Sequence, residues 1–463
     1  MQVSKTFGGA LTGAVLAFHS IVAMASAEEW PARFEGHGGP VKSVAISSDG
    51  RSVLSASFDY AAILWSIEGG EAKIVHRLIG HEAAVNDAHF ANGTFAVSVS
   101  DDGSIALWDL ETGEMASRID EGGDKMLSVA VNEDGSRALA ASWDRNAYLY
   151  AIEEGKLTRL AKLGGHRGNV NSVDFLPDGT GILTASYDGG IRLFDATSGE
   201  LEREIYAHGW GVNVIKAMPD GKTVLFGATD GAVGLVSIET GEEVKVLPPH
   251  ERPVLSLALS TDGTKAASGG GDGKIRFMST LDWALEEEFE NPYGPVWGMA
   301  ITPDNTTVLY AGLDDHVNAW QVSPRKPFEP IDNDFPRRFQ VSDTDDPGEL
   351  QFARKCSVCH TLKPDDANRA GPTLYKLFGR KAGSLPGYPY SDALKRADFT
   401  WTEETVSNLF DHGPDVVTPG SKMPIQRLKD HKTRDALVAF LKRATDPAAQ
   451  SEEDVTKQKE GEK

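Results

Sequence analysis

The sequence predicts a multidomain protein in which an all-β propeller of seven repeats is followed by a small all-α domain. Two observations predict this fold class. A pattern of about 42 residues recurs seven times before residue 325, and helical signals surround the only two cysteines, which lie after residue 345. With 40% apolar and 25% charged residues, the composition is that of an ordinary soluble protein with two or three domains.

Each repeat carries an Asp six residues before an apolar or aromatic residue, and the gaps between these Asp residues are 43, 42, 44, 42, 42 and 42. The seven are Asp59, Asp102, Asp144, Asp188, Asp230, Asp272 and Asp314. In five repeats a His lies 21 or 22 residues upstream of the Asp, and these are His37, His81, His166, His208 and His250. Turn sequences such as "SSDGR" and "LPDGT" divide each repeat into four short strands. A single four-stranded blade cannot bury both faces, so we expect seven blades in a ring to bury them against one another.

A repeat of this length, with "GH" near its start and "D…W" near its end, resembles the WD40 repeat over residues 30 to 322. The resemblance implies that the repeated His, Asp, Ser or Thr, and Trp form a buried hydrogen-bond network in each blade and are scaffold, not a catalytic triad. Repeats 3 and 7 lack the His and have Gly122 and Pro292 near that position. The last repeat ends at Trp320 without a fourth strand, so we expect Trp30–Phe34 to supply that strand and close the ring.

The first 27 residues predict a secretory signal peptide, because Lys5 precedes an apolar run that ends in "ASA" at 25–27. An uncleaved anchor over Phe7 to Ala25 is the alternative. We therefore expect an exported, periplasmic protein with no membrane span after cleavage. The expected parts are the signal peptide (1–27), the propeller (28–325), a proline-rich linker (326–345), the helical domain (346–446) and a disordered tail (447–463).

The net charge of −22 argues against nucleic acid as a partner, since nucleic-acid binding needs a basic surface. The charge is unevenly distributed. Residues 346–446 carry 16 Lys and Arg against 13 Asp and Glu, so the acidic excess lies outside the helical domain.

The stretch "KCSVCH" contains both cysteines of the chain, followed at once by a histidine. In an exported protein, C-x-x-C-H is a signal for covalent c-type haem attachment. Two thiols add across the two vinyl groups of one haem, and the adjacent imidazole reaches the iron from the same side. A C-x-x-C redox motif would require a thioredoxin-like βαβ pattern, which is not visible, and a structural zinc would require more ligands than these. We therefore expect one covalently attached haem c, with its iron, on Cys356, Cys359 and His360.

The second axial ligand has three candidates downstream, namely Met423, His412 and His431. Met423 lies in "TPGSKMP", a Pro- and Gly-rich loop between two helical stretches, where a core-filling methionine would be out of place. The helices themselves have clear limits. Asp346 and Pro347 suit the start of a helix that runs into the cysteine motif, and residues 432–447 predict a closing helix with Thr433 as its cap.

Residues 346 to 445 resemble a class I cytochrome c of the mitochondrial type. The matching segments are Gly348 and Phe352, "CSVCH", "GPTLYKLFGRKAG", "PGYPYSDAL", "FTWTEET", "PGSKMP" and "ALVAFLKR". The resemblance implies that Cys356 and Cys359 bind haem covalently, that His360 and Met423 are the axial ligands, and that Arg380, Tyr390 and Trp401 hydrogen-bond the propionates. It also implies that the neighbourhood of Pro372 accepts the second N–H of His360 and that Gly348 allows close contact with Phe440.

The sequence departs from this family where Leu394 replaces a common asparagine and where Leu409 or Phe410 replaces a common tyrosine. We therefore expect a more apolar haem pocket on the methionine side.

The expected function is single-electron transfer, because His/Met ligation closes both axial positions. The propeller would be a docking platform for a redox partner, and Lys363, Lys376, Lys381, Lys422 and Arg427 could form a basic rim at the haem edge. We expect an electron carrier and not an enzyme. The alternatives are a haem-containing oxidoreductase, or a subunit of one, and a haem-bearing scaffold for assembly or sensing.

Overall fold

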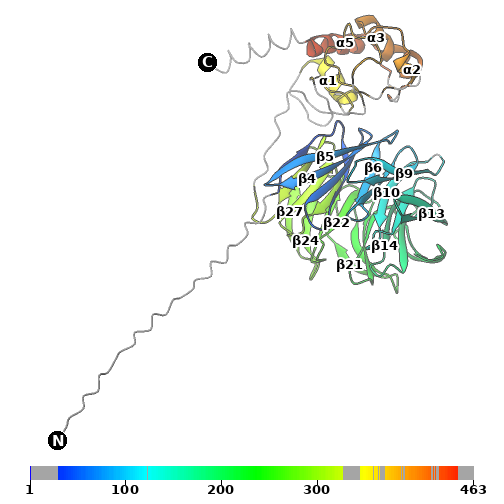
Figure 1. Ribbon diagram of the computed structural model, residues 1–463, viewed down its shortest axis with the longest axis vertical. Helices are drawn as coiled ribbons and strands as arrows, with labels where there is room; N and C mark the ends of the chain where they lie inside the picture. The colour runs from blue at the N-terminus through cyan, green and yellow to red at the C-terminus, as the bar shows by residue number, and fades with distance from the viewer. Residues whose placement is uncertain are drawn as a thin grey trace.

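The computed structural model consists of a β-propeller and a helical domain, which lie one above the other in Figure 1. The residues that it describes are 1, 30–122, 124–326, 345–357, 359–362, 364, 371–386, 388, 390, 392–418, 421, 423 and 427–446. The predicted signal peptide, most of the linker and the predicted tail lie outside the described residues. No helix of the described residues is long and apolar enough to cross a membrane.

The propeller contains seven four-stranded antiparallel sheets, as the repeats predict. Six blades use four consecutive strands each. Blades 1 and 2 comprise β2 (Val41–Ile46), β3 (Ser52–Ser57), β4 (Ala61–Glu68), β5 (Glu71–Ile79), β6 (Val85–Phe90), β7 (Phe95–Ser100), β8 (Ser104–Asp109) and β9 (Met115–Asp120). Blades 3 and 4 comprise β10 (Met126–Val131), β11 (Arg137–Ser142), β12 (Ala147–Glu153), β13 (Lys156–Leu163), β14 (Val170–Phe175), β15 (Gly181–Ser186), β16 (Gly190–Asp195) and β17 (Leu201–Ala207). Blades 5 and 6 comprise β18 (Val212–Ala217), β19 (Thr223–Ala228), β20 (Val233–Ser237), β21 (Glu243–Leu247), β22 (Val254–Leu259), β23 (Lys265–Gly270), β24 (Lys274–Ser279) and β25 (Leu285–Glu290).

Blade 7 joins the two ends of the ring. It comprises β26 (Val296–Ile301), β27 (Thr307–Gly312), β28 (His316–Gln321) and, from the other end of the chain, β1 (Arg33–Glu35). Strand β1 pairs antiparallel with β28, so that Phe34 lies opposite Val317. Phe34 is fully buried and meets the ring of Trp65 of blade 1 edge-on at 5.7 Å between centroids. The expected closure by the N-terminal segment is therefore confirmed, although the strand begins at Arg33.

Apolar side chains fill the spaces between neighbouring blades and form the core of the propeller. Each cluster takes its members from two adjacent blades; one, for example, joins Leu107 of β8 to Tyr150 of β12. Another joins Leu149 of β12 to Phe194 of β16. Burial between blades, and not within one, is what a ring of sheets requires, because each sheet has two apolar faces.

The repeated polar residues form the internal networks that the repeats imply. In blade 1 the ring of His37 contacts Asp59 at 2.9 Å and the Ser55 hydroxyl at 2.7 Å, and the indole N–H of Trp65 donates to Ser55 at 2.8 Å. Blade 2 repeats the arrangement with His81, Asp102, Ser98 and Trp108. A group that recurs in this way in successive blades is scaffold.

Blades 3 and 7, which lack the repeated His, use other partners. In blade 3 the Tyr148 hydroxyl donates to Asp144 at 2.5 Å, and the Tyr150 hydroxyl donates to Glu121 at 2.9 Å. In blade 7 the amide of Asn318 donates to Asp314 at 3.3 Å. These contacts hold the loop Asp in both blades, so the missing His does not leave that carboxylate without a partner.

The helical domain contains α1 (Pro347–Lys355), α2 (Asp392–Lys395), α3 (Glu403–His412), α4 (Pro414–Val417) and α5 (His431–Thr445). Asp346 caps α1 as expected, by accepting from the backbone N–H of Gly348 at 2.7 Å. The expectation that Thr433 caps the last helix is wrong. Asp430 is the N-cap and accepts from the backbone N–H of Thr433 at 2.8 Å, because α5 begins at His431, three residues earlier than a helix capped by Thr433 would.

Acid is expected to destabilise the propeller. Burial lowers the pKa of His166 and of His250, which keeps both rings neutral in the folded chain. Burial alone would raise the pKa of Asp188, but hydrogen bonds from the backbone N–H groups of Arg167 and Gly190 and the interaction with His166 lower it to about 2. In each case the unfolded chain binds more protons than the folded chain. The contribution of each group to the free energy of unfolding is therefore complete above the pKa of that group in the unfolded chain, which is near 6.5 for the histidines and 3.8 for the aspartate. The contribution is lost as the pH falls below that value.

Thermal unfolding of the full chain tests this expectation when it is followed from about pH 7.5 to about pH 5. The midpoint should fall with the pH. His250→Gln should cost roughly 1–3 kcal/mol at neutral pH, because its contacts to Asp272 and Ser268 are lost, yet its midpoint should fall less steeply in acid. A midpoint that does not depend on pH in this range would contradict the assignment.

Candidate haem site

A tight turn at the end of α1 presents the two cysteines and the histidine. Helix α1 ends at Lys355, and the carbonyl of Cys356 then accepts the backbone N–H groups of Cys359 at 3.0 Å and of His360 at 2.9 Å. This turn keeps the C-x-x-C-H residues within one compact loop. The two thiols and the imidazole therefore lie beside the same cavity.

Close packing of α1 on α5 holds this turn in place. A Cβ atom on Gly348 would lie 2.1 Å from the Ala436 carbonyl oxygen and 2.7 Å from Cβ of Phe440, so only glycine permits this approach. Phe352 of α1 packs against Phe440 with ring centroids 5.6 Å apart. The predicted contact of Gly348 with Phe440 is thus observed.

The ring of His360 is held from its far side. Its Nδ1 donates to the Pro372 carbonyl oxygen at 2.7 Å, which leaves Nε2 as the nitrogen that would coordinate a metal. Gly371 provides the space for the ring, because a Cβ atom there would lie 2.3 Å from Cε1 of His360. The expectation that the neighbourhood of Pro372 orients this imidazole agrees with this geometry.

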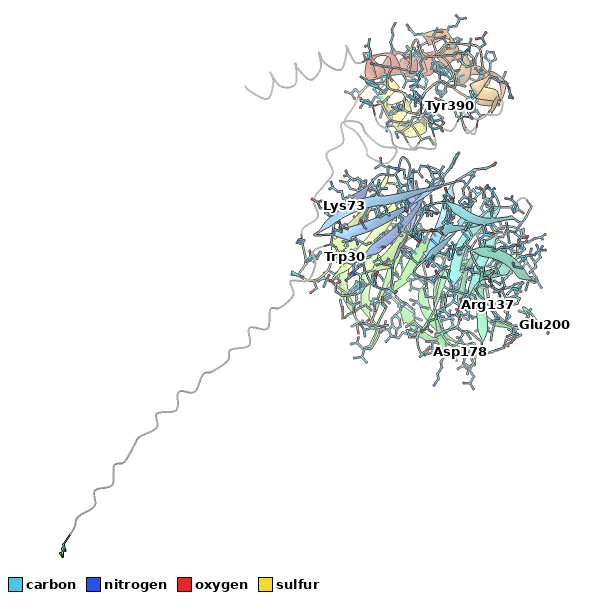
Figure 2. All side chains as sticks on the ribbon, in the orientation of Figure 1. Trp30, Lys73, Arg137, Asp178, Glu200 and Tyr390 are labelled. Atoms are coloured by element: carbon cyan, nitrogen blue, oxygen red, sulfur yellow. The ribbon has the colours of Figure 1, made fainter. Side chains whose placement is uncertain are left out.

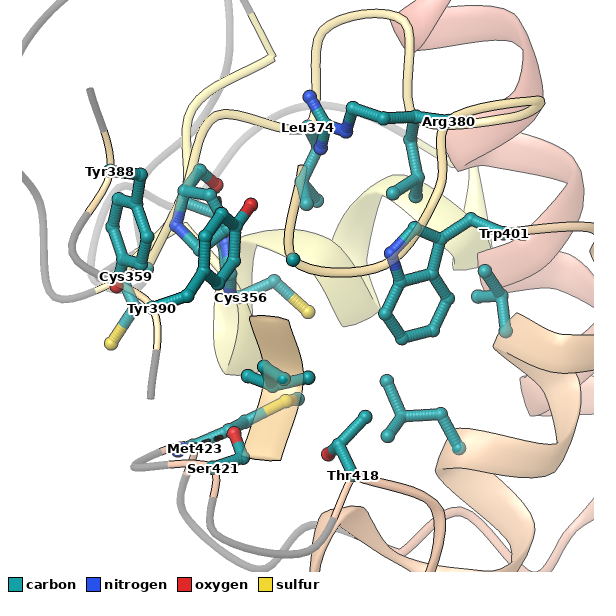
Figure 3. Close-up of a pocket in the computed structure, with 18 of the residues that line it drawn as sticks. Cys356, Cys359, Leu374, Arg380, Tyr388, Tyr390, Trp401, Thr418, Ser421 and Met423 are labelled. Carbon is teal, nitrogen blue, oxygen red and sulfur yellow. Dashed lines mark hydrogen bonds between the residues drawn. The ribbon is translucent and has the colours of Figure 1, made fainter. Parts of the chain in front are cut away.

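A cavity of about 320 Å³ opens beside this turn. Both cysteines, His360 and Met423 line it, and Figure 3 shows Met423 on the opposite side of the cavity from Trp401 and Arg380. Most of the remaining lining from the helical domain is apolar, and it includes Leu374, Leu377, Leu394, Val406, Leu409, Phe410 and Leu441. The volume falls in the range of protein ligand sites. Leu394, Leu409 and Phe410 all face the cavity, so the expected apolar character near Met423 is observed.

The described residues that line this cavity do not include His412 or His431, the other two candidates for the second ligand. His412 is exposed, at the end of α3, and His431 contacts the Arg434 guanidinium at 2.9 Å at the start of α5. The backbone N–H of Met423, by contrast, is held by the Ser421 hydroxyl at 3.1 Å at the cavity wall. The structure therefore brings together Cys356, Cys359, His360 and Met423, and leaves the alternative histidines outside.

Three polar residues line the cavity where an acidic edge of a ligand could be held. They are Arg380, Tyr390 and Trp401. Burial lowers the pKa of Arg380, whose guanidinium donates to the carbonyls of Thr373 at 2.8 Å and Tyr375 at 3.2 Å. An anionic group in the cavity would offset the cost of burying this cation.

The proposed basic rim is only partly described. Lys363 and Lys422 lie outside the described residues. Lys381 pairs with Asp398 at 3.2 Å, the Lys376 ammonium lies 5.4 Å from the Tyr375 ring, and Arg427 donates to the His412 carbonyl at 2.8 Å.

The two thiols are not those of a reactive redox motif. Burial raises the pKa of the Cys356 thiol to about 12 and also raises that of Cys359. A catalytic C-x-x-C motif needs a lowered thiol pKa, because the thiolate is the nucleophile. The raised thiol pKa values therefore argue against disulfide exchange at this motif.

The cavity also has a wall that the sequence reasoning missed. Phe58, Tyr60, Ala83, Ala84 and Asp101, all from loops of propeller blades 1 and 2, line it together with the helical domain. Neither the repeat pattern nor the cysteine motif predicts this contact. A signal for it was present, since Tyr60 follows the repeated Asp at a position where four other blades have glycine.

Comparison with known proteins agrees with both parts of this architecture. The WD domain, G-beta repeat family (WD40) matches residues 29–66, 72–109, 157–195 and 241–278. Over 98 residues the chain is 42% identical to a cytochrome c of Cochliobolus lunatus, an alignment that covers 21% of this chain and 90% of that protein. A cytochrome c of Arabidopsis thaliana is 41% identical over 98 residues, with coverage of 21% and 87%. A cytochrome c2 of Blastochloris viridis is 41% identical over 95 residues, with coverage of 20% and 73%.

The fold and the site thus define a WD40 β-propeller combined with a haem-binding electron-carrier domain. Through the segment that spans nearly the whole length of these relatives, the chain belongs to the cytochrome c family. The residues present fit a haem group: the cavity is mainly apolar, Gly371 leaves room for an oriented imidazole, and the half-buried cation of Arg380 lines the cavity.

Gly371→Ala tests the role of the space beside His360. The added Cβ would displace the imidazole, so we expect the yield of haem-loaded protein to fall severalfold, or the loaded protein to show a weakened histidine–iron bond in its absorption spectrum. The matched control is Gly93→Ala, where an added Cβ meets nothing within 4 Å. Normal yield with an unchanged spectrum for Gly371→Ala would contradict the assignment.

Proposed function

We propose that this chain is a periplasmic c-type cytochrome that transfers single electrons through one haem, with the propeller as a docking platform for a redox partner. The haem is attached to Cys356 and Cys359, and His360 and Met423 are its axial ligands. The observation that carries the proposal is the single cavity lined by these four residues.

The haem supplies a one-electron redox centre when it is bound, and the chain supplies its setting. The Pro372 carbonyl holds His360 in one tautomer, and Met423, which lines the same cavity, would supply the second axial ligand. With both axial positions taken by protein, no site remains for a substrate on the iron, so the chain is a carrier and not a catalyst. The apolar wall of Leu394, Leu409 and Phe410 favours the less charged state of the haem, and so a higher reduction potential.

Arg380, Tyr390 and Trp401 are proposed to hydrogen-bond the propionates. The half-buried guanidinium of Arg380 is the strongest candidate of the three, because two backbone carbonyls hold it and it lines the cavity. These side chains would hold the anionic propionates of a bound haem, while Cys359 and the propeller residues line the same cavity.

Export to the periplasm is proposed from the apolar leader at residues 1–27 and from the cysteine motif, which requires a compartment where haem is attached. The partner is proposed to be a redox protein that meets the propeller or the haem edge. An acidic propeller beside a helical domain with a small positive net charge gives two surfaces of different charge for such a partner.

The test is a haem count and a redox titration of the full chain, purified from the periplasm of a host that matures c-type cytochromes. We expect one haem per chain by the pyridine haemochrome assay and a single one-electron transition. More than one haem, an additional quinone cofactor, or turnover of a small substrate would favour an oxidoreductase and contradict the carrier proposal.

Met423→Ala tests the second ligand. We expect the reduction potential to fall by well over ~59 mV, which is a tenfold change for one electron, and the ferrous protein to bind carbon monoxide. His412→Ala is the matched control and should leave both properties unchanged. If His412→Ala, and not Met423→Ala, changes the spectrum, the ligand assignment is wrong.

A further inference from the structure

The haem cavity of the helical domain is closed on one side by the propeller. The propeller residues at the cavity come from two kinds of loop. Phe58, Tyr60 and Asp101 lie in loops between the second and third strands of a blade, which carry the repeated Asp and are called Asp loops here. Ala83 and Ala84 lie in the loop before β6. All of these loops belong to the propeller end that faces the helical domain, whereas Figure 2 shows Asp178, in a turn of blade 4, at the end away from Tyr390.

Tyr60 has a backbone conformation that disfavours its own side chain. It follows Asp59 with φ of 72°. At the equivalent position, blades 2, 4, 5 and 6 have glycine with φ of 80°, 87°, 92° and 81°: Gly103, Gly189, Gly231 and Gly273. A large aromatic side chain in this left-handed region is strained, and such outliers gather at functional sites, where something else holds them. Glycine therefore meets this turn in four other blades, and a tyrosine here calls for another reason.

That reason lies in the direction of the side chain. Tyr60 is half-buried, and it lines the haem cavity together with Cys359 and Tyr388. Burial raises the pKa of the Tyr60 hydroxyl, so the phenol is neutral where it meets the cavity. The hydroxyl also interacts electrostatically with Cys359, the second cysteine of the motif.

The neighbouring loop residues are held in place by the propeller itself. Phe58 packs on Trp297 with ring centroids 5.7 Å apart, and the Lys42 ammonium lies 4.7 Å from the Trp297 ring. Asp101 accepts from the side-chain amide of Asn86 at 2.7 Å and from the Lys125 ammonium at 2.5 Å. Because these contacts all lie within the propeller, the shape of this surface does not depend on the helical domain.

We propose that Tyr60, supported by Phe58, is a haem-contacting residue supplied by the propeller, which seals the Cys359 edge of the haem from water and from external redox reagents. The inference rests on the proposed function, since it requires a haem in this cavity. It deepens that function, because the propeller then sets the reduction potential and the exposure of the haem as well as offering a docking surface. A sealed edge disfavours the more charged oxidised haem, so the seal raises the reduction potential.

Tyr60→Gly separates a role toward the haem from a structural role. Glycine relieves the strained backbone, so the midpoint of thermal unfolding should stay the same or rise. The reduction potential should fall, and the rates of reduction by ascorbate and of oxidation by ferricyanide should rise severalfold. Tyr60→Phe keeps the ring and should behave as the unmodified chain in all three measurements.

Arg145→Gly is the matched control. Arg145 occupies the same loop position in blade 3 with the same φ of 72°, and it does not line the cavity among the described residues. Its replacement should relieve the same strain without changing the potential or the rates.

The inference is overturned if Tyr60→Gly leaves both the potential and the rates unchanged, or if Arg145→Gly changes them equally. Failure of the proposed function gives a different result. If that function is wrong, the unmodified chain will not contain a single haem with a low-spin spectrum, whatever the variants do.

Discussion

The hydrogen bond from Nδ1 of His360 to the Pro372 carbonyl is the interaction on which the site depends. It fixes the tautomer and the plane of the imidazole, and Gly371 leaves the space that this plane requires. Cys356 and Cys359 can face the same cavity as His360 because α1 ends at Lys355 and the chain then turns. Helix α1 is held in place because Gly348 allows it to contact α5 closely. A larger side chain at Gly348 or Gly371 would remove the close contact made there.

The propeller depends on a different constraint, which is closure. Each of the seven sheets has two apolar faces, and all of these faces are buried only when the ring is closed. Three residues of β1, which pair with β28, close it. This closure also brings blade 7 beside blade 1, where Trp297 of β26 packs against Phe58 of the blade 1 Asp loop. The surface that meets the haem cavity therefore includes a contact across the closure of the ring.

Much of this architecture could be predicted from the sequence, because repeats and motifs are local patterns. The period of the Asp residues predicts the blades, and the position of Met423 in a Pro/Gly loop predicts a place beside the cavity. The cap of α5 was missed because Asp430 and Thr433 are both good caps three residues apart, and only the backbone shows which one the helix follows. The tyrosine at a glycine position marked Tyr60 as unusual, but the contact itself could not be predicted, because Tyr60 and Cys359 are about 300 positions apart and no repeat or motif links them.

The central claim is that Met423 is a ligand of a single haem held in this cavity. Proton NMR of the reduced full chain, with methyl-labelled methionine, tests it most directly, because a methionine bound to haem iron lies over the macrocycle and its methyl resonance is shifted far upfield. The account predicts one such resonance among all the methionine methyl signals, and its loss in Met423→Ala. A spectrum without a shifted methyl, or a shifted methyl that survives the substitution, would contradict it.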